Sequence, residues 1–230
     1  EMLAYIVIAV ILCLIVLTVV TDSFIIPVLL LGNIGVAILY NMGTNIFLGE
    51  ISYITKAISA VLQLGVTMDF SIFLYHKYIQ ALTHEKDRHK AMQEAIAETF
   101  HSVLGSSLTT VAGFLALCMM KLTLGKDIGL VMAKGVICGL ICVLTLFPSL
   151  LLVCDKLIEK THHKNLMPEF KGLQNFSIKY HNLIILAFII LLIPAIYGNN
   201  NVKVYYNLDK SLPSTLASSI ANSNLKEEFH

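Results

Sequence analysis

Hydrophobic residues gather into six long runs, and this pattern predicts the architecture of the chain. The runs cover residues 2–20, 24–42, 57–78, 103–122, 128–154 and 183–197. An α-helix rises about 1.5 Å per residue, so roughly 20 apolar residues cross the hydrocarbon core of a bilayer, which is about 30 Å thick. We therefore expect an all-α polytopic membrane protein with six transmembrane helices, of which the last needs flanking residues to reach across.

The polar segments between these runs predict how the helices are connected. Residues 21–23 are the whole connection between the first two runs, which indicates a tight helical hairpin. Residues 43–56 are half polar and too short to span, so we expect a loop or interfacial turn. Residues 83–101 begin with charged residues and continue with apolar residues at helical spacing, which predicts an amphipathic helix lying on the membrane surface or against the ends of the bundle. Residues 161–181 contain Pro168 and Gly172 and are interpreted as a linker.

The basic residues orient the chain in the membrane. If the six spans alternate, one side holds the lysines and arginine of residues 77–90 and the five lysines of residues 155–181, whereas the loop at 121–127 holds two lysines. Cytoplasmic loops carry the excess of Lys and Arg. The basic side is therefore predicted to be cytoplasmic, the helix at 57–78 runs inward, and the next span runs outward.

Composition excludes several classes of function. The chain is 57% hydrophobic and 13% charged, which is too apolar for a soluble domain. The net charge of +1 identifies no partner, because the charges are sorted by side of the membrane, and we expect no nucleic-acid partner. The five cysteines and eight histidines show no disulfide framework or metal-site spacing, so we expect no metal and no cofactor. No Ser/His pair or HExxH motif appears in the sequence, and an enzyme is not expected.

Asp69 is the main candidate for function, because it stands inside an apolar run. An uncompensated Asp at a bilayer centre costs roughly 2.5 to 3.5 kcal/mol, so its presence is by default a functional hypothesis. It precedes Lys77 by eight residues and so lies roughly 12 Å above the cytoplasmic edge. We expect hydroxyls of two other spans at a similar depth, namely Thr109, Thr110 and Thr145. Two interpretations stay open: these hydroxyls form a proton relay with Asp69, or small residues allow close helix packing.

Lys134 is a second charge inside an apolar run. It lies roughly 10 Å from the outer end of the fifth span and differs in depth from Asp69 by about 10 Å. One interpretation is that the side chain extends outward until its ammonium reaches the interface. The alternative is an ion pair with Asp69, either direct or through water.

Four stretches resemble the MMPL family of transporters, which belongs to the resistance-nodulation-division superfamily. Residues 65–74 resemble the motif of that family's fourth helix, with Gly65 in the approach, Asp69 as the acid and an aliphatic run ending in a basic residue. Residues 102–117, which include Ser106 and Gly113, resemble the fifth helix. Residues 144–151 resemble the end of the sixth helix, and the last span followed by residues 204–213 resembles the start of a half.

This resemblance implies a domain organisation. Residues 1–160 would be transmembrane helices two to six of a first half, with the amphipathic helix at about 83–101 on the cytoplasmic side. Residues 182–198 would be the first helix of the second half, and residues 199–230 would start an extracytoplasmic domain. The chain is then interpreted as a fragment whose partners are the second half of the same polypeptide, membrane lipids and a hydrophobic or lipid substrate. A homo-oligomer stays open.

The resemblance also implies a function. The family is expected to export lipids or other hydrophobic compounds across the bacterial cytoplasmic membrane, with protons as the coupling ion carried by the acid that Asp69 matches. Phe70 departs from the family's Tyr and removes a hydroxyl, for which Thr109, Thr110, Thr145 or bound water could substitute. Two alternatives share the same helical core: a lipid- or sterol-sensing module, and a protein-export auxiliary of the SecDF type.

Overall fold

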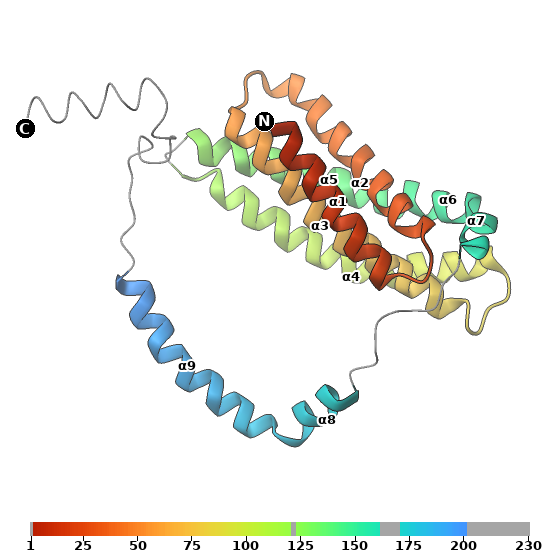
Figure 1. Cartoon of the computed structure of the whole chain (residues 1–230). Coiled ribbons are helices and arrows are strands. Elements are labelled where there is room, and N and C mark those ends of the chain that lie inside the picture. Colours follow the sequence, from red (N-terminus) through yellow and green to blue (C-terminus); the bar gives the residue numbers. More distant parts are fainter. Residues whose placement is uncertain (1, 121–122, 162–170, 202–230) are drawn as a thin grey trace, which may run out of the picture. The chain divides into compact units, whose positions relative to one another are not determined.

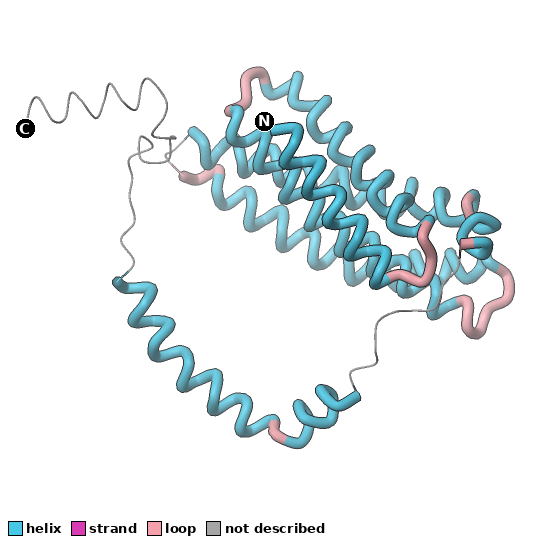
Figure 2. Tube along the Cα trace, viewed as in Figure 1, coloured by secondary structure: helices cyan, strands magenta, loops and turns pink. Residues whose placement is uncertain are grey.

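Helices make up every element that the structure describes. The computed structural model describes residues 2–120, 123–161 and 171–201, and it divides the chain into two units at residues 168 and 169 (Figures 1 and 2). The division falls inside the stretch interpreted as a linker, and each unit is described by itself. The predicted all-α membrane architecture is confirmed.

The first unit holds most of the helices. In chain order they are α1 (Met2–Val20), α2 (Ile25–Gly43), the 3₁₀-helix η1 (Thr44–Leu48), α3 (Tyr53–Ala81), α4 (Arg88–Leu117), α5 (Thr123–Leu144), α6 (Leu146–Val153) and α7 (Asp155–Lys160). Four stretches of this unit are long and apolar enough to cross a membrane, namely α2 with η1, α3, α4, and α5 with α6. The run predicted at 2–20 is α1.

Helix α3 shares the centre of the first unit with α5, because each of the two packs against α2, α4 and the other, while α1 packs against α2 and α3 (Figure 1). Ser52 starts this helix, since its side chain accepts a hydrogen bond from the backbone N–H of Ile54 at 3.3 Å. The apolar core at one end of the unit is built from fully buried side chains of α2, α3 and α6, among them Ile26, Leu74 and Phe147.

The amphipathic stretch predicted at 83–101 is helical from Arg88, and it forms one continuous helix with the span that follows. Asp87 accepts a hydrogen bond from the backbone N–H of His89 at 3.0 Å and starts a helix that continues to Leu117 without a break. No Gly or Pro interrupts the sequence before Gly105, so nothing ends the helix at the membrane surface. The 30 residues of α4 extend about 45 Å, and the apolar stripe of its first half, including Met92 and Ala95, is buried in the bundle.

The predicted fifth span is interrupted. Helix α5 ends at Leu144, and α6 begins at Leu146 after Thr145 takes a non-helical conformation with φ −122° and ψ −60°. Pro148 explains the break, because it has no N–H to donate to the carbonyl four residues earlier. One apolar run therefore contains two helices.

Contacts at the predicted cytoplasmic end join distant parts of the first unit. Arg88 at the start of α4 forms ion pairs with Asp155 and Glu159 of α7. The hydroxyls of Ser23, in the hairpin between α1 and α2, and of Thr161 lie 2.6 Å apart. These contacts hold the ends of α2, α4 and α7 together and so help to set the packing of the spans.

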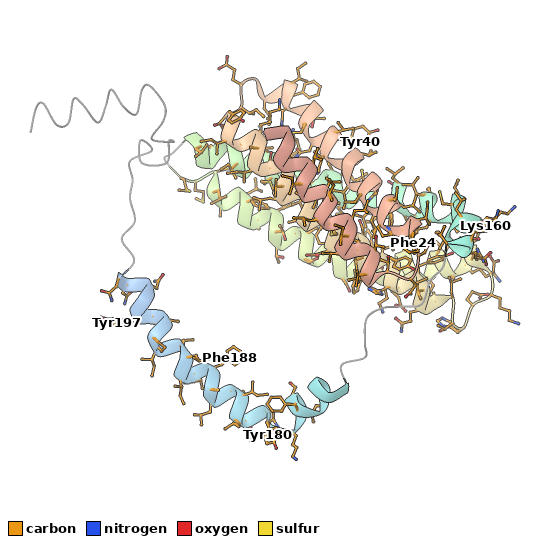
Figure 3. The ribbon with its side chains drawn as sticks, in the orientation of Figure 1. Phe24, Tyr40, Lys160, Tyr180, Phe188 and Tyr197 are labelled. Atoms are coloured by element: carbon orange, nitrogen blue, oxygen red, sulfur yellow. The ribbon has the colours of Figure 1, made fainter. Side chains whose placement is uncertain are left out.

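The second unit contains α8 (Lys171–Lys179) and α9 (His181–Asn201). Helix α9 is the predicted last span, and it is apolar on all sides, with exposed side chains such as Phe188 and Tyr197 (Figure 3). The linker predicted at 161–181 includes α8. Most of the extracytoplasmic segment predicted at 199–230 lies outside the described residues.

Candidate functional site

Asp69 lies on the outward face of α3. Its side chain is exposed, as are those of Phe73 and His76 on the same face. Phe70 is only 8% exposed and packs into the apolar core. Successive residues of a helix are turned by about 100°, so the acid and the residue at the family's Tyr position point in different directions.

A cavity of about 350 Å³ lies beside Asp69, between α3 and α4. Its walls are Asp69, Phe70 and Phe73 from α3, and Ser102, Val103 and Ser106 from α4. The structure therefore brings the predicted acid next to Ser106, one of the residues that the motif on the following helix singles out. Gly65 lies one turn before Asp69 on the same exposed face.

The other predicted hydroxyls lie elsewhere. Thr109 and Thr110 each donate a 2.8 Å hydrogen bond to the carbonyl of Ser106, and neither lines the cavity of Asp69. Thr145 donates to the carbonyl of Ile141 at 2.6 Å and lines a different cavity, together with residues of α2. All three hydroxyls are thus occupied by their own helix, and their relay role stays a prediction.

The α4 face beside Asp69 carries small residues and is little covered. Gly105 and Gly113 have open space where a Cβ would be, and Ser106 and Thr109 are exposed. In the apolar window of α4 11% of the residues are buried, against 39% in those of α2, α3 and α5–α6. A face of small residues allows another helix to approach closely, so this surface is suited to packing against a further membrane helix.

Lys134 is not paired with Asp69. Its ammonium donates a 2.5 Å hydrogen bond to Oδ1 of Asn45 in η1, and the ion pairs among the described residues do not include it. Asn45 follows α2 at the end predicted to face outward. Of the two interpretations, extension of the side chain towards the outer end agrees with this contact, and a direct ion pair with Asp69 does not.

The chemistry of the site is that of a single carboxylate. Within the described ranges, no group of three His, Cys, Asp or Glu side chains is arranged to hold a metal ion. Asp69 has serine hydroxyls beside it on α4, and hydroxyls both donate and accept hydrogen bonds. Such an arrangement can bind and release a proton.

A second polar region was missed by the sequence reasoning, on the opposite face of α3. Five polar side chains with at most 1% exposure follow one another at four-residue spacing: Thr55, Ser59, Gln63, Thr67 and Ser71. Residues four apart share one face of a helix, so this spacing was visible in the sequence. It marks a polar face that packs inward, against α2 and α5.

Side chains of α2 and two glycines of α5 complete this buried seam. Nδ2 of Asn41 donates to Oε1 of Gln63 at 2.7 Å, and Nε2 of Gln63 donates to the carbonyl of Gly135 at 3.1 Å. A Cβ on Gly135 would lie 2.5 Å from Asn41, and one on Gly139 would lie 2.5 Å from the Thr67 hydroxyl. The glycines therefore leave the space that the polar side chains occupy.

Comparison with known proteins agrees with the helical architecture. Residues 1–168 match the model of the MMPL family. ActII-3 of Streptomyces coelicolor, which is named as a membrane protein, is 33% identical over 51% of this chain and 16% of its own length. A protein of Methanocaldococcus jannaschii that is likewise named as a membrane protein is 35% identical over 47% of this chain and 27% of its own length.

A third relative has a named activity. The siderophore exporter MmpL5 of Mycobacterium tuberculosis is 28% identical over 68% of this chain and 16% of its own length. The chain thus spans about a sixth to about a quarter of the length of these relatives. Because the family match covers well over half of the described helices and of the sequence, this multi-pass membrane chain belongs to the MMPL family.

Proposed function

We propose that the chain is part of an exporter of lipids or other hydrophobic compounds, driven by the proton-motive force across a bacterial cytoplasmic membrane, with Asp69 as the proton-carrying residue. The observation that carries this proposal is the position of Asp69, whose carboxylate borders a cavity between two membrane helices instead of pairing inside the bundle. Family membership and the named activity of MmpL5 support export as the reaction.

Protonation at Asp69 would change the charge of the α3–α4 face. An ionised carboxylate favours a hydrated cavity, whereas a protonated one can pack against apolar neighbours and donate a hydrogen bond to Ser102 or Ser106. If two helix packings bind the proton with different affinities, protonation shifts the equilibrium towards the packing with the higher affinity. The size of the shift is set by the difference in affinity. This coupling would move the helices that bind substrate.

The second half of the same polypeptide is the partner that we propose for the exposed face of Asp69 and α4. The face is polar and small, which suits close helix packing, and its low burial leaves it free for the helix that we propose to cover it. The cavity beside Asp69 would then be enclosed. No enzymatic step and no cofactor is part of this proposal, and a homo-oligomer stays an alternative partner.

Transport by the complete gene product in vesicles with an imposed proton gradient tests the role of Asp69. Asp69→Asn should abolish both proton influx, followed with a pH-sensitive dye, and efflux of a fluorescent phospholipid, because the amide cannot carry a proton. Asp69→Glu should retain part of both. Glu50→Gln, which removes an exposed carboxylate that does not line the cavity of Asp69, is the matched control. Full gradient-driven transport by Asp69→Asn would contradict the proposal.

Lipid or sterol sensing is a second candidate, and one cavity favours it. The cavity measures about 310 Å³, and its walls are apolar residues of α1, α2 and α3, including Ala9, Leu31 and Val61. Gly35 lines it and has open space at its Cβ position. Gly35→Leu should therefore fill the cavity and reduce labelling by a photoactivatable sterol.

The matched control for this second candidate lies on the same helix. Gly32 also has open space but does not line the cavity, so Gly32→Leu should leave the labelling unchanged. Equal labelling of both variants would remove the support that the cavity gives to sensing. Transport by Asp69→Asn and labelling at Gly35 are independent measurements, so the two candidates can be separated.

A further inference from the structure

A groove on the flank of the bundle lies between α2 and the α5–α6 pair, away from Asp69. Its volume is about 530 Å³, and residues of both sides line it, namely Val36, Tyr40 and Thr44 on one side and Cys138, Ile141 and Thr145 on the other (Figure 3 labels Tyr40). None of these residues lines the cavity of Asp69. The groove is therefore a separate feature of the first unit.

The walls of the groove are apolar in effect. The hydroxyl of Thr44 donates to the carbonyl of Tyr40 at 2.7 Å, and that of Thr145 donates to the carbonyl of Ile141 at 2.6 Å. Each hydroxyl hydrogen is used within its own helix and so is not available for donation to a ligand, and apart from the Tyr40 hydroxyl the rest of the lining is aliphatic, aromatic or thiol. The lining thus suits a hydrocarbon chain.

Lys134 lies where this groove ends. Positions 134, 138, 141 and 145 are spaced by four, three and four residues, so Lys134 continues the face of α5 that lines the groove. From the other side, Thr44 lines the groove, and the next residue, Asn45, accepts the hydrogen bond from the Lys134 ammonium. One end of an apolar groove therefore carries a positive charge.

The charge of Lys134 is not neutralised within the described residues. Asn45 is a neutral partner, and the described ion pairs lie at the other helix ends, on Lys77, His84 and Arg88. An ammonium has three N–H donors, so two are left after the bond to Asn45. A lysine at membrane depth is costly unless it is paired or hydrated, and an anionic group placed here would lower that cost.

We propose that this groove binds an acidic phospholipid of the surrounding membrane, with the phosphate on Lys134 and one acyl chain along the groove towards Leu146. The lined part of the groove runs from Cys138 to Leu146, about 12 Å along α5 and α6, which accommodates part of one acyl chain. The proposal goes beyond the transport function and does not depend on it.

Photolabelling tests the site directly, with the complete protein in nanodiscs that contain a photoactivatable phosphatidylglycerol or a phosphatidylcholine with the same acyl chains. Labelled peptides are then identified by mass spectrometry. We expect phosphatidylglycerol to label α2 and α5 at least about tenfold more than phosphatidylcholine, a ratio that corresponds to about 1.4 kcal/mol. Lys134→Met should remove this preference, and Lys134→Arg should retain it.

Two further variants keep the test decisive. Lys126→Met removes an exposed lysine near the start of α5 that lines a different cavity, and it should leave the preference unchanged. Val36→Trp should fill the groove and reduce labelling of the groove by both lipids. The ratio of labelling by the two lipids at other sites of the protein should not change. Equal labelling of the groove by both lipids in the unmodified protein, or an unchanged preference in Lys134→Met, would overturn the proposal. The first comparison needs no variant, so poor folding of Lys134→Met does not affect it.

Discussion

The two faces of α3 place polar residues in opposite environments. The inward face places Gln63 and Ser71 in a seam where both are fully buried and hydrogen-bonded to α2 or α5. The outward face places Asp69 at an open cavity beside α4, with no ion pair to another described residue. The inward face is neutral: Gln63 and Ser71 have hydrogen-bond partners, while the Thr55 and Thr67 hydroxyls have none among the described residues. The outward face is charged and accessible.

The difference between the faces separates residues that hold the fold from a residue available for function. A buried polar group is costly when unpaired, so the seam specifies the one helix packing in which its amides find partners. A carboxylate that no described side chain pairs contributes little to that packing. Stability measurements on variants of each face test this separation.

Gly139→Leu should have the largest effect, because a Cβ there would lie 2.5 Å from the hydroxyl of Thr67. Overpacking of this kind costs about 3 kcal/mol or more when backbones must separate. The free energy of unfolding in detergent measures the loss. Gly113→Leu, at a position on α4 with open space, is the control and should cost less than about 1 kcal/mol. Equal stability of the two variants would contradict close packing of α3 on α5.

Gln63→Leu should cost about 1 to 3 kcal/mol, since it leaves the Asn41 amide and the Gly135 carbonyl buried without their partner. Chemical denaturation provides the measurement. Gln93→Leu replaces an exposed glutamine of α4 and should change stability by less than about 0.5 kcal/mol. A Gln63→Leu variant as stable as the unmodified protein would show that the seam does not specify the packing.

Thr67→Val should be neutral or stabilising by up to about 1 kcal/mol, because the buried Thr67 hydroxyl has no hydrogen-bond acceptor or donor within the described residues. The comparison variant is Thr109→Val, which removes an exposed hydroxyl bound to the backbone. Thermal unfolding of both variants gives the result. A loss above about 1 kcal/mol for Thr67→Val would mean that an ordered water occupies the seam.

Much of the architecture could be predicted from hydrophobic runs, but the packing faces could not. Runs of apolar residues predict where spans lie, whereas the start of α4 at Arg88 depends on the Asp87 cap and on the absence of a helix breaker. Asp69 was predicted from the motif at residues 65–74, and its α4 neighbour Ser106 from the motif at residues 102–117. Thr145 was placed by depth alone, and depth does not determine which side of a helix a residue faces.

The buried seam shows why polar residues in membrane helices are ambiguous from sequence. Gln63, Thr67 and Ser71 lie in the same run as Asp69. Asp69 was chosen as the functional candidate because a charged side chain costs more to desolvate than a neutral one. The neutral residues carry a periodicity of four, which indicates a common face. The sequence does not say whether that face meets lipid, water or another helix, since this depends on α2 and α5.

Asp69→Asn should have the smallest effect on stability, within about 0.5 kcal/mol, because the carboxylate forms no ion pair within the described residues and lies at an exposed position. Chemical denaturation in detergent provides the measurement. If stability is retained while transport by the complete protein is lost, the outward face of α3 serves function and the inward face serves folding. A loss above about 1 kcal/mol would instead place Asp69 among the residues that hold the fold, and the contrast between the two faces would fail.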